Sequence, residues 1–237
     1  MAVIKFPYLL IVFILLFSFS CTSHKKEELS LDYIIRPARI QSDHPPLLVL
    51  LHGRGANEMD MYEVAKLIDE RYTVLCPRGI DTLAKDSYSW FPLLKQDGLY
   101  LSDELALKEI ADRIYDLIDE LQPNFSYNQN NIIIGGFSQG AMLATELFYQ
   151  GRFYGHIGAS GAIINPPIDK KKLSGPKHSL IIHSINDELV PFENANKLEQ
   201  LMLKNSVSVQ LFTQRIGHSI DRESIDVINN WLKSISN

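Results

Sequence analysis

Short apolar runs alternate with longer amphipathic stretches over residues 30–237. The apolar runs are almost continuous, which is typical of strands covered on both faces of a sheet. The predicted strands are residues Leu47–Leu51, 73–76, Ile132–Phe137, 157–160, 180–183 and 208–212. Strands that alternate with helices predict a mainly parallel sheet with helices on both faces. No linker divides this region, so we expect one α/β domain over residues 30–237.

The amphipathic stretches predict helices at residues 103–121, 194–204 and 224–235. The first is the clearest, because apolar residues recur at helical spacing from Ile110 onward and Pro123 ends the pattern. Ser102 is its expected N-terminal cap.

Residues 6–23 carry no charge and differ sharply from the rest of the chain. Lys5, the short apolar core that follows it and then small residues fit a secretory signal peptide over residues 1–20. The polar residues 21–29 predict a tether between this leader and the domain. The leader therefore indicates a protein that is exported to the periplasm or the cell surface.

Cys21 directly follows the leader and resembles the processing site of a bacterial lipoprotein, where the cysteine becomes the acylated first residue. Ser18 departs from that pattern, which usually has leucine there. We expect a lipid-modified Cys21, and membrane contact only through the leader or this lipid. Simple secretion is one alternative, and an uncleaved membrane anchor is another, because Lys25 and Lys26 follow the apolar run.

Composition excludes several classes of protein. The 237 residues carry 23 basic and 28 acidic side chains, for a net charge of −5, which argues against nucleic acid as the main partner. The two cysteines exclude a disulfide scaffold and a four-cysteine zinc site. No fixed period recurs, so solenoids and propellers are unexpected.

The most informative segment is Gly-Phe-Ser-Gln-Gly at residues 136–140, between a predicted strand and a helix of small and apolar residues. This strand–turn–helix context is what a nucleophile elbow requires. Ser138 must stand at a strained turn, and Gly136 and Gly140 leave room for it. The Gln139 N–H then lies at a helix N-terminus, directed at a developing oxyanion. A glycine-rich turn with an incidental serine is the alternative.

A second loop, at residues 52–55, follows the strand Leu47–Leu51 with the sequence His-Gly-Arg-Gly. In hydrolases with a nucleophile elbow, such a loop supplies the second oxyanion donor. The donor predicted here is the backbone N–H of Arg54. We expect His52 to hold the loop in place and the Arg54 side chain to be solvated.

A serine nucleophile needs a base and an acid that orients the base. In this arrangement the acid and the histidine follow the serine in chain order, each after a strand. Asp187 lies just beyond the strand at 180–183, with Glu188 as the close alternative, and His218 is the histidine after it. The other histidines lie in unsuitable places, and no close metal-ligand spacing indicates a metal site.

Four segments together resemble the phospholipase/carboxylesterase family of α/β-hydrolases, which includes the acyl-protein thioesterases. They are residues 51–57, 136–140, 183–191 and 217–218, in order along nearly the whole domain. The resemblance implies an α/β-hydrolase fold, a triad of Ser138, Asp187 and His218, and an oxyanion hole formed by the backbones of Arg54 and Gln139. Ser184 departs from the glycine usual in the family.

The substrate pocket is less well defined by the sequence. Trp90 and Phe91 lie in the long connection that precedes the helix at 103–121, where family members carry a similar aromatic segment. They either line an acyl or aromatic pocket or anchor the loop. Elements follow one another too closely for an inserted lid domain.

These observations predict a serine hydrolase that cleaves carboxylic esters in small-molecule substrates, with thioesters as a second bond type. We expect it to need no cofactor. One alternative is a serine peptidase of related fold. Another is a non-catalytic binding protein on a hydrolase scaffold.

Overall fold

The computed structural model describes residues 31–123, 125–165 and 173–236. The predicted leader, the tether and Cys21 lie outside the described residues. Within the described part of the chain, no helix combines the length and the apolar character needed to cross a bilayer.

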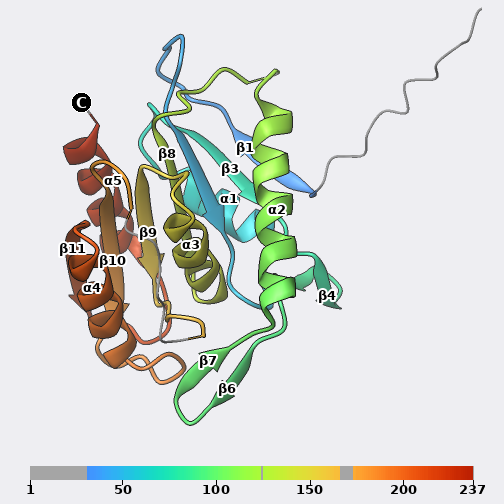
Figure 1. Cartoon of the computed structure of the whole chain (residues 1–237). Helices are drawn as coiled ribbons and strands as arrows, with labels where there is room; N and C mark the ends of the chain where they lie inside the picture. The colour runs from blue at the N-terminus through green and yellow to red at the C-terminus, as the bar shows by residue number, and fades with distance from the viewer. Residues whose placement is uncertain (1–30, 124, 166–172, 237) are drawn as a thin grey trace, which may run out of the picture.

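A seven-stranded sheet forms the centre of the domain (Figure 1). Its spatial order is β1 (Tyr33–Arg36), β3 (Thr73–Pro77), β2 (Leu47–Leu51), β8 (Ile132–Phe137), β9 (Gly155–Ala159), β10 (His178–Ser184) and β11 (Ser208–Gln214). Within this sheet, β1 pairs antiparallel with β3, and all other neighbouring strands are parallel. This confirms the predicted mainly parallel sheet.

Helices cover both faces of the sheet, as predicted (Figure 1). The helices are α1 (Glu58–Ala65), α2 (Glu104–Leu121), α3 (Gln139–Tyr149), α4 (Glu193–Lys204) and α5 (Arg222–Ile235). Alternation along β2 shows how the two cores form. Leu47, Val49 and Leu51 face the core shared with α2, α3 and α4. Leu48 and Leu50 face the core shared with α1 and α5.

Elements outside the main pattern were not expected from the sequence. They are β1, α1 and two antiparallel hairpins in the connection from β3 to α2. The hairpins are β4 (Asp81–Ala84) with β5 (Ser87–Ser89), and β6 (Leu94–Gln96) with β7 (Leu99–Leu101). Their strands are short and mostly exposed, so they carry little hydrophobic periodicity. The connection thus contains hairpins and no helical lid.

One local prediction was wrong. The N-terminal cap of α2 is Asp103, whose side chain accepts a hydrogen bond from the Ala106 N–H at 3.0 Å. Ser102 instead donates its hydroxyl to the Pro92 carbonyl at 2.6 Å. Both residue types favour caps, so a one-residue difference in where the helix begins decides between them.

The carboxyl ends of the parallel strands meet at one edge of the sheet. β2 ends at Leu51, β8 ends at Phe137, just before Ser138, β10 ends at Ser184, and β11 ends at Gln214. The loops that carry the predicted site residues therefore meet at this edge, which is where ligands bind in open α/β sheets.

Candidate active site

Ser138 stands at a strained turn between β8 and α3. Its φ is 54° and its ψ is −118°, a region that few residues other than glycine adopt. A Cβ on Gly136 would overlap the backbone of Gly140, and a Cβ on Gly140 would overlap the Leu51 carbonyl. The two glycines therefore allow the close approach of helix and strand that raises Ser138 above the sheet.

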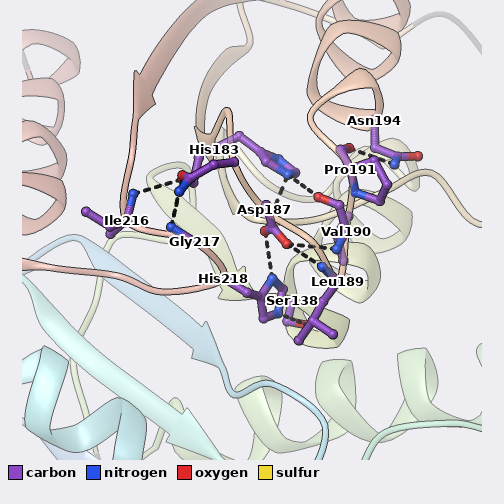
Figure 2. A network of polar contacts seen from close by, with 12 residues as sticks. Ser138, His183, Asp187, Leu189, Val190, Pro191, Asn194, Ile216, Gly217 and His218 are labelled. Atoms are coloured by element: carbon purple, nitrogen blue, oxygen red, sulfur yellow. Dashed lines mark hydrogen bonds and ion pairs between the residues drawn. The ribbon is translucent and has the colours of Figure 1, made fainter.

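A continuous chain of hydrogen bonds joins the three residues of the predicted triad (Figure 2). His218 Nε2 lies 2.9 Å from Ser138 Oγ, and His218 Nδ1 lies 2.7 Å from Asp187 Oδ2. An ionised Asp187 can only accept, so the proton on the neutral ring lies on Nδ1 and Nε2 is free to accept from the serine hydroxyl. The geometry is therefore that of a nucleophile with its base and its orienting acid.

The environment of Asp187 keeps its carboxylate ionised. The side chain is fully buried, and Oδ1 accepts the N–H groups of Leu189 at 3.0 Å and Val190 at 2.8 Å. Burial alone would raise the pKa of Asp187, but the hydrogen bonds from Val190 and His218 outweigh it, and the pKa lies below its ordinary value. Glu188, the alternative acid, is exposed. Only Asp187 has the contact with His218 that the role requires.

His183 supports the acid loop from behind. Its ring is fully buried, and Nε2 donates to the Val190 carbonyl at 2.8 Å. Burial lowers the pKa of His183, which favours the neutral ring. The sequence placed this histidine among those unsuited to act as the base, and its buried contact with Val190 fits a structural role. Figure 2 shows it beside Asp187 and away from Ser138.

The predicted oxyanion loop passes close to the nucleophile. A Cβ on Gly53 would lie only 3.4 Å from the Cβ of Ser138, so the backbone leading to Arg54 runs beside the serine. The β5 strand holds this loop through two backbone hydrogen bonds, from the Gly55 N–H to the Tyr88 carbonyl at 2.7 Å and from the Tyr88 N–H to the Ala56 carbonyl at 3.0 Å. The Arg54 side chain is exposed, as expected.

His52 fixes the start of the same loop. It is fully buried, and its Nε2 accepts the Gly79 N–H at 2.9 Å. Desolvation by burial lowers its pKa and favours the neutral form. Trp90 donates its indole N–H to the His52 carbonyl at 2.7 Å, and the two rings lie 4.7 Å apart between centroids. His52 thus connects β2 to the segment that carries Trp90.

Gln139, the first residue of α3, joins that segment to the elbow. Its side-chain oxygen accepts the backbone N–H of Trp90 at 3.1 Å, and its side-chain NH₂ group donates to the Phe91 carbonyl at 2.8 Å. Trp90 and Phe91 are buried, with 0% and 1% of their surface exposed. These contacts favour the loop-anchoring alternative, and substrate contact by either ring stays a prediction.

Two further contacts at the acid loop were not predicted from the sequence. The Leu189 carbonyl accepts hydrogen bonds from Tyr100 Oη at 3.1 Å and from Lys95 Nζ at 3.2 Å. Both donors belong to the β6–β7 hairpin, so this hairpin rests on the loop that carries Asp187. No pattern in the sequence connects residues so far apart along the chain.

In the described ranges, no group of three or more His, Cys, Asp or Glu side chains gathers as metal ligands. The expectation that no cofactor is needed stays a prediction.

Comparison with known proteins identifies the family. The family model described as Phospholipase/Carboxylesterase matches residues 35–236. The chain belongs to the phospholipase/carboxylesterase family. As a member, it is an esterase-type hydrolase, and the predicted α/β-hydrolase fold is confirmed.

Proteins from three bacteria illustrate what this chain is similar to. MhqD of Bacillus subtilis, described as a candidate hydrolase, is 24% identical over 191 residues, which cover 79% of this chain and 92% of that protein. The Bacillus cereus carboxylesterase structure has a TM-score of 0.75 at 23% identity, over 86% of this chain and 94% of that one. A Mesorhizobium loti carboxylesterase has a TM-score of 0.76 at 20% identity, over 87% and 96%. At these identities the solved structures show the fold alone.

Proposed function

We propose that this esterase hydrolyses carboxylic esters of small molecules, with thioesters as a second bond type, through a covalent acyl-enzyme on Ser138. The observation that carries the proposal is the unbroken chain from Ser138 Oγ through both nitrogens of His218 to Asp187 Oδ2. Such a chain activates a hydroxyl that is otherwise a weak nucleophile.

In the first half-reaction, His218 Nε2 takes the proton as Ser138 Oγ attacks the ester carbonyl carbon. The carbonyl oxygen becomes an oxyanion, which the backbone N–H groups of Arg54 and Gln139 stabilise. The carbon–oxygen bond to the alcohol then breaks, and His218 returns its proton to the leaving alcohol. Asp187 holds the tautomer throughout and stabilises the imidazolium.

In the second half-reaction, water replaces the alcohol. His218 removes a proton from the water, the resulting oxygen nucleophile attacks the acyl carbon, and the bond to Ser138 Oγ breaks. The serine regains its proton from His218, and the carboxylic acid leaves. The step consumes one water and needs no other reactant.

An activity-based probe tests the assignment directly. A fluorophosphonate should label the wild-type protein, and Ser138→Ala should abolish both labelling and hydrolysis of p-nitrophenyl esters. Ser219→Ala is a matched control, because the Ser219 hydroxyl is exposed and, among the described residues, contacts only the Ile220 carbonyl, at 3.5 Å. Labelling that persists in Ser138→Ala would overturn the proposal. Cleavage of dipeptide amides without cleavage of esters would favour a peptidase.

We also propose that the enzyme is exported and tethered to a membrane by a lipid on Cys21. The support is the uncharged segment at residues 6–23 with Cys21 near its end. Growth of an expressing bacterium with a labelled fatty acid should label the wild type but not Cys21→Ala. An unlabelled wild-type protein found in the cytoplasm would contradict both parts of this proposal.

A further inference from the structure

We propose that Ser184 is a positioning residue whose hydroxyl ties the loop of the acid to the loop of the base. This inference rests on the proposed function, because it takes Asp187 and His218 as that acid and base. Ser184 is the last residue of β10, and none of its surface is exposed. Its side chain therefore lies beneath the site and does not face a substrate.

Every hydrogen-bonding position of the Ser184 hydroxyl is used. Oγ accepts the N–H groups of Ile216 and Gly217, each at 3.0 Å, and it donates to Asn186 Oδ1 at 2.6 Å, with the Gln214 carbonyl as a longer alternative acceptor at 3.3 Å. A hydroxyl has one donor and two lone pairs, so these contacts satisfy it completely. Ile216 and Gly217 lie next to each other on the same side of the site in Figure 2. One side-chain oxygen thus holds two successive residues of the base loop.

Asn186 reinforces the same connection. Its Oδ1 also accepts the Gly217 N–H, at 3.1 Å. Ser184 and Asp187 close a turn through the hydrogen bond from the Asp187 N–H to the Ser184 carbonyl at 3.2 Å. Within this turn, Ser184 and Asn186 hold Gly217 while Asp187 holds His218. The acid loop therefore fixes both the base and the residue immediately before it.

The base loop needs such support because it lies beyond the paired part of the sheet. β11 ends at Gln214, and α5 begins at Arg222. Gly217 adopts a φ of +71°, a conformation that directs the chain into His218. Removing the Ser184 hydroxyl leaves the N–H groups of Ile216 and Gly217 without their main acceptor. The His218 ring then loses a constraint on its position relative to Ser138.

The positioning role proposed for Ser184 depends on this chain having a serine at that position. A glycine at position 184 has no side-chain oxygen, so it cannot accept the two N–H groups. The serine that departs from the family pattern in the sequence therefore supplies a specific contact in the structure.

The test is Ser184→Ala in the full chain, with kinetics expressed per active site titrated by the fluorophosphonate. We expect kcat to fall about 10- to 100-fold, because small misplacements of catalytic groups cost this much. KM should stay within about twofold, since no substrate contact is lost. Ser219→Ala, the matched control on the base loop, should keep wild-type values of both constants. A purely structural role would reduce the number of titrated sites but leave kcat per site unchanged.

Asn186→Ala provides a second route if Ser184→Ala fails to fold. Asn186 is exposed, so its truncation leaves the core intact, yet it removes an acceptor from the Ser184 hydroxyl and from the Gly217 N–H. We expect a smaller fall in kcat, about three- to tenfold, in line with the loss of one modest hydrogen bond. If both variants keep the wild-type kcat per site and Ser138→Ala is inactive, the inference about Ser184 is overturned and the proposed triad stands. An active Ser138→Ala would overturn the triad and the inference together.

Discussion

The replacement of Asp187 by asparagine is the sharpest test of the triad, because the structure dictates which way the amide must face. The Asp187 Oδ1 position receives two backbone N–H groups, from Leu189 at 3.0 Å and Val190 at 2.8 Å. An amide NH₂ at that position would oppose both donors, so the amide oxygen must lie there. The NH₂ group then occupies the Oδ2 position, which lies 2.7 Å from His218 Nδ1.

The consequence for His218 follows from its two nitrogens. An NH₂ group donates, so Nδ1 must accept, and the ring proton moves to Nε2, which lies 2.9 Å from Ser138 Oγ. A protonated Nε2 cannot take the serine proton. The same change in a serine protease triad lowers kcat about 10⁴-fold. At 1.36 kcal/mol for each factor of ten, this corresponds to about 5 kcal/mol of transition-state stabilisation.

The assay is hydrolysis of a p-nitrophenyl ester by Asp187→Asn near pH 7.5, with urea unfolding to verify that the variant is folded. Glu188→Gln is the matched control, because Glu188 is the neighbouring acid and its side chain is exposed. We expect Glu188→Gln to retain wild-type kcat. A folded Asp187→Asn within tenfold of the wild type, together with a large loss in Glu188→Gln, would refute the assignment of the acid.

Two further predictions concern stability and the hairpin. The hydrogen bond from Arg78, with a smaller effect of backbone contacts, holds the pKa of Glu58 below its ordinary value. The ionised carboxylate therefore stabilises the fold fully above about pH 4.3, the ordinary pKa of a glutamate. This stabilisation is lost as the pH falls through the lowered pKa. Urea unfolding of Glu58→Gln should therefore show a shallower loss of stability than the wild type between about pH 5 and pH 3, and parallel curves would contradict this. Tyr100→Phe removes the hydrogen bond to the Leu189 carbonyl and should lower the free energy of unfolding by about 1 kcal/mol. Hydrogen exchange in the β6–β7 hairpin should become faster in this variant, and unchanged exchange would show that the contact does not hold the hairpin.

Much of the fold was predictable because its signals are local. β2 and β8 read as continuous apolar runs, and α5 has a clear apolar stripe. The turn at Ser138 was also predictable, since glycines two residues away on each side allow close backbone approach. Each of these features depends on residues that are close together in the sequence, so each could be predicted from the sequence alone.

Other parts of the site depend on contacts between distant residues. The sequence left Asp187 and Glu188 as alternatives, and burial of the first with exposure of the second separates them. The hydrogen bonds from the N–H groups of Ile216 and Gly217 to Ser184 join two loops more than thirty residues apart, and no periodicity marks them. The β6–β7 hairpin is short and exposed, so its pairing was equally invisible.

The position of Trp90 has a practical consequence. Its indole is buried against His52 and hydrogen-bonded to the backbone at the start of the oxyanion loop, whereas the other tryptophan, Trp231, lies in α5 on the opposite face of the sheet. Trp90 is therefore an intrinsic fluorophore placed within the candidate active site. In a Trp231→Phe background, its emission would report on the predicted oxyanion loop during the proposed acylation and deacylation without any attached dye.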